Sequence, residues 1–311
     1  MLLSIIVPCY NEEENIRAFY DKTKMELGTV LSHAEFVFVD DGSRDGTLAE
    51  IKKLSEEVPE RVRAVSFSRN FGKEAALLAG LRTARGDLVA IIDADLQQNP
   101  KYIGDMLEFL AHHPDFDCVA AYQENRKEGR VLGFFKSLFY RLINRMTDVE
   151  FYRAASDFRL LKRKVVDAIL SMPERCRFSK GIFSWVGFKT HYMPYEVEPR
   201  FAGKTKWSFW RLASYAVDGI VAFSDKPLIL SSVLGVLLFL IAILMMLWVV
   251  IKTLLFGDPV AGFPTLASLI LSLSGLQLLC LGILGRYLAK MYEEIKARPV
   301  YLVREEIDNE K

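Results

Sequence analysis

The sequence predicts an α/β protein with a mostly parallel, doubly wound sheet, followed by a hairpin of two transmembrane helices. Over the first 122 residues, short apolar runs alternate with segments of helical periodicity, a pattern typical of parallel strands joined by helical crossovers. Nearer the C-terminus, residues 228–251 and 260–285 contain no charged side chain. At about 1.5 Å per residue, each run can cross a bilayer core of roughly 30 Å.

The apolar runs predict five strands, at residues 2–7, 35–40, 61–67, 87–92 and 116–121. The periodic segments predict helices over residues 12–31, 45–57, 72–84 and 100–112. Asn99 followed by Pro100 is typical of a helix start and supports the last of these. The first run has no basic flank and ends at Pro8 before a group of acids. We therefore interpret it as a buried strand and not as an export signal.

The composition argues against several classes of protein. The 311 residues carry a net charge of +1, and no domain-wide basic surface suggests nucleic-acid binding. The four cysteines and four histidines show no metal-ligand spacing, so we expect reduced structural thiols and no zinc site. The sequence contains no P-loop, GxGxxG or kinase signature, so phosphoryl transfer and dinucleotide redox chemistry have no support.

Polar segments directly follow four of the predicted strands. They are "PCYNEEEN" (8–15), "DDGSRDGT" (40–47), "SRNFGKEA" (68–75) and "DADLQQ" (93–98). In a parallel sheet such loops meet at the carboxyl edge, where α/β proteins bind their ligands. The sequence therefore predicts a binding site formed by these four segments together.

The last segment predicts a divalent metal site. Asp93 and Asp95 point to the same side if the strand geometry continues through them, and two nearby carboxylates repel each other unless a cation lies between them. Mg²⁺ or Mn²⁺ is the natural partner, with Gln97 as a third oxygen ligand and substrate phosphates completing the shell. Helix capping explains one of these acids but not both. Such an ion stabilises a departing nucleoside diphosphate, which favours a sugar nucleotide as substrate.

Five motifs in order resemble the family 2 glycosyltransferases: "IIVPCYNEEENI", "FVFVDDGSRDGT", "SFSRNFGKEAAL", "IIDADLQQNP" and "SDFRLL". The most similar group has a GT-A fold and transfers a sugar to polyisoprenyl phosphate. It includes the dolichol-phosphate mannose synthases and the bacterial undecaprenyl-phosphate glucosyl-, GlcNAc- and aminoarabinosyl-transferases. The resemblance covers residues 1–210, and the paired C-terminal spans match the bacterial subgroup. It implies inverting transfer from a UDP- or GDP-sugar, with UDP favoured, in cell-envelope glycan modification.

The resemblance also implies roles for individual residues. The nucleotide-sugar would contact Pro8, Tyr10, Glu12, Asp40, Asp41, Lys73, Asp93 and Ala94. The metal would be held by Asp93, Asp95 and Gln97, which makes both acids catalytic. For "DDGS" a simple turn is an additional interpretation, and Lys73 is equally consistent with a solvated side chain.

Asp157 in "SDFRLL" matches the position assigned as catalytic base in the family. The acceptor phosphate has a second pKa of about 6, so near neutral pH it hardly needs to be deprotonated. Asp157 could instead orient the donor sugar or Arg159, accept the last proton, or be a structural turn carboxylate.

A dianionic acceptor beside a diphosphate requires cations. We expect it to be bound by Arg126, Arg130, Arg200, Lys204 and Lys206. Of these, Arg200 and Lys204 match the acceptor-side motif of the family. Basic residues next to a membrane span can also serve only topology and anionic lipids.

The expected organisation places a cytosolic catalytic domain at residues 1–205, with an amphipathic helix at about 129–147 that lies on the membrane. An ordinary helix that packs on the core is the alternative for this segment. A juxtamembrane segment (206–226), two spans (227–252 and 260–286), a short external loop (253–259) and a cytoplasmic tail (287–311) would follow. Basic outer flanks orient both termini to the cytoplasm of a cell inner membrane, and a homo-oligomer is compatible with small residues in the spans. The alternatives are a processive polysaccharide synthase, disfavoured because the chain lacks a QxxRW motif, and a non-catalytic scaffold that binds lipid phosphates.

Overall fold

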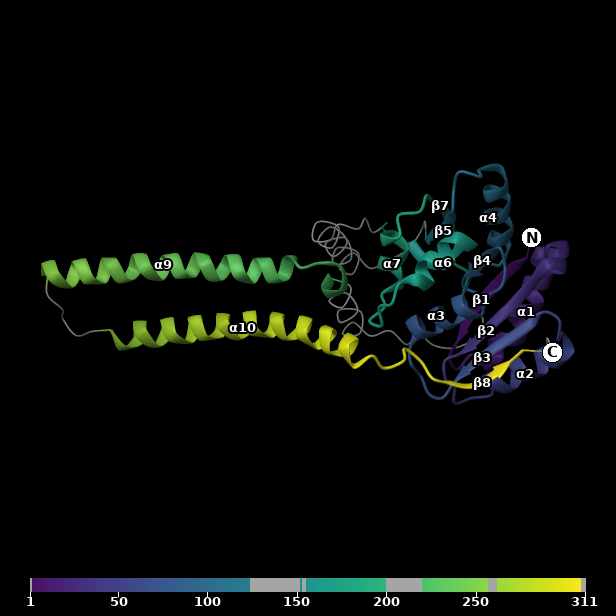
Figure 1. Cartoon of the computed structure of the whole chain (residues 1–311), viewed down its shortest axis with the longest axis horizontal. Helices are drawn as coiled ribbons and strands as arrows, with labels where there is room; N and C mark the ends of the chain where they lie inside the picture. The colour runs from purple at the N-terminus through teal and green to yellow at the C-terminus, as the bar shows by residue number, and fades with distance from the viewer. Residues whose placement is uncertain (1, 124–151, 153–154, 200–219, 257–261, 309–311) are drawn as a thin grey trace.

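One mixed sheet forms the core of one end of the protein, and two long helices extend away from it (Figure 1). The computed structural model describes residues 2–123, 152, 155–199, 220–256 and 262–308. The sheet has eight strands in the order β7-β5-β6-β4-β1-β2-β3-β8. The strands are β1 (Leu3–Cys9), β2 (Ala34–Asp40), β3 (Val62–Phe67), β4 (Leu88–Ile91), β5 (Cys118–Gln123), β6 (Ala155–Lys162), β7 (Thr190–Tyr195) and β8 (Val303–Ile307). The helices are α1 (Glu13–Leu27), η1 (Gly28–His33), α2 (Thr47–Glu57), α3 (Lys73–Thr83), α4 (Lys101–His112), α6 (Arg163–Ser171), α7 (Ser179–Trp185), α9 (Lys226–Phe256) and α10 (Phe263–Lys296).

The sheet is mostly parallel because only β6 and β8 run against their neighbours. Every residue of β2 is buried, as expected for a central strand that is covered on both faces. Helices α1, α2 and α4 pack on one face through residues such as Phe19, Ile51 and Met106. Helices α3, α6 and α7 pack on the other face through residues such as Leu77, Val166 and Ile182. This arrangement confirms the predicted α/β, doubly wound fold class.

The five predicted strands are all present, with ends that shift by a residue or two. The first predicted helix, residues 12–31, extends too far at its C-terminal end. Helix α1 stops at Leu27 because Gly28 adopts a positive φ of 48°, and residues 28–33 form a separate 3₁₀ turn. The predicted amphipathic helix at 129–147 lies outside the described residues.

The C-terminal third contains two long apolar helices, α9 and α10, which extend side by side away from the sheet (Figure 1). Both are long and apolar enough to cross a membrane, as the sequence predicted. Helix α10 continues past residue 286 to Lys296, and the chain then returns to the sheet. Part of the segment predicted to be a tail is therefore strand β8, which pairs with β3.

Candidate active site

The four polar segments meet at one edge of the sheet. They follow β1, β2, β3 and β4, which are consecutive neighbours in the order β4-β1-β2-β3 and run in the same direction. The predicted convergence at the carboxyl edge is therefore what the structure shows.

The loops after β1 and β2 are tied together by hydrogen bonds. The backbone N of Asn11 donates to Ser43 Oγ (2.9 Å), and Asn11 Oδ1 accepts from the backbone N of Arg44 (2.9 Å). The backbone N of Glu12 donates to Thr47 Oγ1 (2.8 Å). Asn11 itself has a φ of 54°. The segment that carries Pro8, Tyr10 and Glu12 is thus held in one conformation by the "DDGS" loop.

Asp40 and Asp41 are both buried and both hold loops in place. Asp40 Oδ1 accepts from the backbone N of Ser43 (2.9 Å), and Asp40 Oδ2 accepts from Ser66 Oγ (2.7 Å). Asp41 accepts from the backbone N atoms of Phe71 (2.6 Å) and Gly72 (2.9 Å). Burial raises the pKa of Asp41, although these two donors oppose the shift. The turn interpretation therefore fits Asp40, whereas Asp41 holds the loop after β3. Contact of either acid with a nucleotide base stays a prediction.

Lys73 lies at the centre of the site. Gly72, with a φ of 97°, turns the chain into α3, where Lys73 is the first residue. Lys73 Nζ lies 2.7 Å from Asp93 Oδ1 and 2.9 Å from Asp157 Oδ2. Burial lowers the pKa of Lys73, but the two carboxylates outweigh this effect and raise it overall. The ammonium group therefore bridges two acids, and the alternative of a merely solvated Lys73 is wrong.

Asp157 is ionised at neutral pH. It lies on β6, which pairs antiparallel with β4 and so brings Asp157 near the end of that strand. Burial would raise the pKa of Asp157, but the charges of Lys73 and Lys180 outweigh burial and hold the pKa well below its usual range. A carboxylate with such a low pKa is a poor general base, so this environment favours an orienting role.

Arg159 does not pair with the Asp157 side chain. Its guanidinium donates to the backbone oxygens of Ser156 (2.9 Å) and Asp157 (3.4 Å). It also lies over the ring of Phe183, at 3.6 Å from the centroid. Arg159 is therefore a buried support beneath the site.

Asp93 and Asp95 lie in the turn region that follows β4, beyond the end of the predicted strand. Strand β4 ends at Ile91, yet Ile92, Ala94 and Leu96 all pack into one core cluster, so the predicted placement of the two acids on one side stays a prediction. Asp95 Oδ1 accepts from the backbone N of Gln97 (3.2 Å). Ala94 is buried between the two acids.

The chemistry of this turn fits a hard divalent cation, since carboxylate and amide oxygens are the ligands that such ions prefer. Asp93 already faces a cationic group, the ammonium of Lys73. Within the described residues, no group of three or more His, Cys, Asp or Glu side chains is placed so that it could hold a metal ion. An ion here would therefore need further oxygens, from an amide such as that of Gln97 or from substrate phosphates.

Two residues that support the candidate site, Lys180 and Glu198, were not identified from the sequence. Lys180 on α7 acts on the charge of Asp157. The backbone N of Glu198 donates to the carbonyl oxygen of Gln97 (3.0 Å), and Glu198 Oε1 accepts from Asn99 Nδ2 (2.6 Å). No local signal in the sequence connects these residues with the acids. The predicted acceptor-phosphate residues lie outside the described part of the chain: Arg126, Arg130, Arg200, Lys204 and Lys206.

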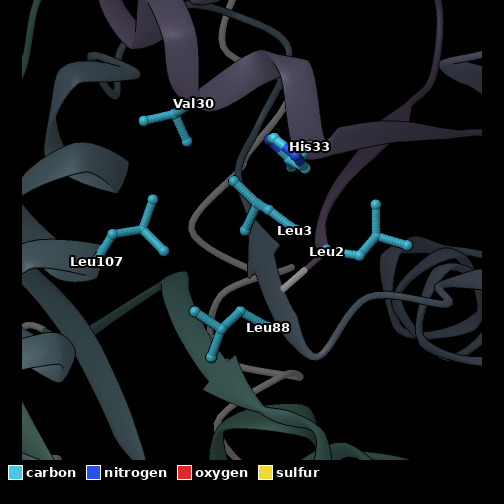
Figure 2. Close-up of a pocket in the computed structure, with 6 residues that line it drawn as sticks. All are labelled: Leu2, Leu3, Val30, His33, Leu88 and Leu107. Carbon is cyan, nitrogen blue, oxygen red and sulfur yellow. The ribbon is translucent and has the colours of Figure 1, made fainter.

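A separate cavity of about 280 Å³ lies at the opposite edge of the sheet. Figure 2 shows the six side chains that line it: Leu2, Leu3, Val30, His33, Leu88 and Leu107. It opens at the amino ends of β1 and β4, and all of these side chains except His33 are apolar. This cavity therefore does not belong to the candidate site.

The model of glycosyl transferase family 2 matches residues 4–170, more than half of the chain. The chain belongs to this family. A bactoprenol glucosyl transferase of Shigella phage SfV is 41% identical over 308 residues, which cover 98% of this chain and 99% of that protein. A prophage bactoprenol glucosyl transferase homolog of Escherichia coli is 40% identical over 98% of this chain and 99% of that protein.

An uncharacterized glycosyltransferase of Synechocystis is also 41% identical, over 97% of this chain and 94% of that protein. Among solved structures, a mannosyltransferase of Pyrobaculum calidifontis in complex with GDP-Man and Mn²⁺ is 23% identical. The match covers 70% of this chain and 62% of the mannosyltransferase chain, with a TM-score of 0.49. That similarity is too low to bear on the site.

Proposed function

We propose that this glycosyltransferase-family protein transfers one sugar from a nucleotide-sugar, preferably a UDP-sugar, to polyisoprenyl phosphate at the cytoplasmic face of a membrane. The observation that carries the proposal is the cluster of Lys73, Asp93 and Asp157 at the carboxyl edge of the sheet. Two relatives of nearly full coverage are named as bactoprenol glucosyl transferases or homologs of them, which supports a polyisoprenyl acceptor.

We infer that the site uses Mg²⁺ or Mn²⁺, held by Asp93, Asp95 and Gln97. When bound, such an ion neutralises the negative charge that develops on a departing nucleoside diphosphate. Lys73 adds a fixed positive charge at the same place. Asp157 keeps Lys73 oriented, because its carboxylate lies 2.9 Å from the ammonium.

The acceptor needs little help to become a nucleophile, because a phosphate monoester is largely a dianion at neutral pH. Its oxygen attacks C1 of the sugar from the side opposite the diphosphate, which inverts the configuration. The basic residues predicted for this phosphate, including Arg200 and Lys204, would hold it against the repulsion of the donor. Asp157 would therefore orient groups in the site and would not need to remove a proton.

The two long apolar helices suggest how the acceptor is reached. If α9 and α10 cross the inner membrane with both termini cytoplasmic, the catalytic domain lies at the surface where the lipid phosphate is found. Fixing donor and acceptor sites at one surface is an orientation effect that can lower a barrier by several kcal/mol, roughly 7 or more. Two helices are enough to hold the catalytic domain at the membrane, but they are too few to form a path for transporting the lipid.

The decisive experiment incubates membranes containing the protein with a panel of labelled sugar nucleotides and undecaprenyl phosphate, then looks for a charged glycolipid. We expect one labelled lipid-linked sugar, with loss of product on addition of a chelator. Asp95→Asn should abolish transfer while the protein still inserts. Asp115→Asn is the matched control, because Asp115 pairs with Lys189 on the surface away from the site.

Two results would overturn the proposal. A labelled polymer in place of a single-sugar lipid would indicate a processive synthase. Absence of product with every nucleotide tested, from a protein that still binds the lipid, would indicate a non-catalytic scaffold.

A further inference from the structure

The segment after α10 returns to the catalytic domain as a strap. Ala297 ends the helix in a left-handed conformation, with a φ of 52°. The chain then runs along the domain and joins the sheet as β8, as the yellow segment in Figure 1 shows. We call residues 297–307 the C-terminal strap. It directly continues one of the two helices that could cross the membrane.

The strap packs against the loop that precedes Lys73. The backbone N of Ser68 donates to the carbonyl oxygen of Leu302 (3.0 Å). The ring of Tyr301 stacks on Phe67, with centroids 4.7 Å apart and an interplanar angle of 17°. Phe67 in turn meets Phe71 edge to face at 5.8 Å. Such aromatic pairs have defined geometries and favour one arrangement of the rings.

Residues 68–72 lead directly into the site. Phe71 and Gly72 donate their backbone N–H groups to Asp41, and the next residue is Lys73. Gly72 has a positive φ, and a side chain there would meet nothing within 4 Å. The backbone of glycine is free to take many conformations, so the course of this loop depends on contacts made by its neighbours.

The end of α10 makes a second connection to the same site. Glu294 Oε1 accepts from the backbone N atoms of Arg175 (2.9 Å) and Cys176 (2.7 Å). These residues precede α7, whose first residue, Ser179, donates its backbone N to Glu74 Oε2 (2.8 Å). Glu74 is the neighbour of Lys73 in the sequence. The last turn of α10 is thus fixed to the domain beside the elements that carry the site.

We propose that the C-terminal strap positions Lys73, and that Tyr301 is the positioning residue through which it acts. The inference rests on the proposed function, because it assigns the strap a role in binding the nucleotide-sugar. Tyr301 acts indirectly: its ring fixes Phe67, Phe67 packs on Phe71, and Phe71 belongs to the loop that presents the ammonium of Lys73 to Asp93 and Asp157. The strap therefore connects the placement of α10 with the geometry of the donor site.

The test compares Tyr301→Ala, Tyr301→Phe and Tyr292→Ala in the full-length protein, purified in detergent. Tyr301→Ala should raise KM for the nucleotide-sugar by roughly 3- to 30-fold and leave KM for polyisoprenyl phosphate unchanged. It should also speed amide hydrogen exchange in residues 68–76. Tyr301→Phe keeps the stacked ring and should restore both properties. Tyr292 is 59% exposed on α10, so Tyr292→Ala is the matched control and should behave as the wild type.

Two results would overturn the inference: wild-type exchange in residues 68–76 of Tyr301→Ala, or faster exchange throughout the sheet including β5, which would show a general structural role. If Tyr301→Ala does not accumulate, Tyr301→Leu replaces it, since leucine fills the space without a stacked ring. Hydrogen exchange needs no substrate. A wild-type protein that transfers no sugar would therefore refute the proposed function and leave the exchange result standing.

Discussion

Replacing Lys73 with methionine tests the ion-pair cluster most directly. Methionine keeps an apolar stem of similar length and removes only the charge. Lys73 contacts two carboxylates, at 2.7 and 2.9 Å, and the exposed fractions of the three side chains are 41% for Lys73, 30% for Asp93 and 19% for Asp157. The three side chains are therefore partly buried. An exposed ion pair contributes at most about 1 kcal/mol, and breaking a fully buried pair costs about 3–5 kcal/mol, so an intermediate value applies here. We therefore expect Lys73→Met to lower the free energy of unfolding by about 2 kcal/mol.

That loss should be visible as a fall of about 4–8 °C in Tm for a domain of this size. Transfer should fall by roughly 100-fold, because a fixed charge at the donor phosphates is removed. The matched control is Lys164→Met. Lys164 pairs with Asp117 at 2.7 Å but is 58% exposed and outside the site, so its removal should cost less than about 1 kcal/mol.

The loss of stability caused by Lys73→Met should be largest at neutral pH and smaller in acid. The folded pKa of Asp157 lies below its ordinary value, so its pairing stabilises the protein above about pH 4 and is lost as the pH falls through the lowered pKa. The difference in Tm between Lys73→Met and the wild type should be full at pH 7 and shrink under acidic conditions. Equal stability and equal turnover of the two proteins at pH 7 would refute the reasoning.

Three further variants test the loops around the site, and a fourth, Gly104→Ala in α4, is the control for the first. Gly42→Ala places a Cβ 2.3 Å from the carbonyl carbon of Arg69 at a φ of 64°, so it should cost more than about 3 kcal/mol and yield little folded protein. Gly104→Ala, whose nearest neighbour is a leucine methyl group at 3.8 Å, should be tolerated. Asp41→Ala removes the acceptor of two backbone N–H groups and should lower the free energy of unfolding by roughly 2 kcal/mol in denaturant titrations. Glu198→Ala removes the side-chain acceptor of Asn99 while keeping the backbone bond to Gln97, and should speed hydrogen exchange in residues 97–99 more than in β2.

The fold was largely predictable because its signals are local. Runs such as residues 36–39 are apolar and β-branched or aromatic, and this run directly precedes polar turn residues, so both the parallel strands and the shared edge followed from the pattern. Strand β6 was different. It lies between β4 and β5 and runs against both, and no local pattern indicates which strands a distant segment will join.

The candidate site was predictable in its residues but not in its geometry. Asp93, Asp157 and Lys73 were all identified, yet the pairing of Lys73 with Asp157 joins residues far apart in the sequence. The end of the strand was misjudged: β4 stops at Ile91, before both Asp93 and Asp95, and Leu96 has a positive φ that the sequence does not indicate for a non-glycine residue. Glu198 reaches the same turn through contacts that only the folded chain brings together.

The pairing of β8 with β3 has a consequence for biosynthesis. Without β8, strand β3 would present an unpaired edge, which invites association with other chains. The ribosome makes β8 only after both apolar helices, so the sheet is completed last. A nascent catalytic domain therefore stays unfinished until both apolar helices have been synthesised, and products that terminate within α9 or α10 should aggregate or be degraded.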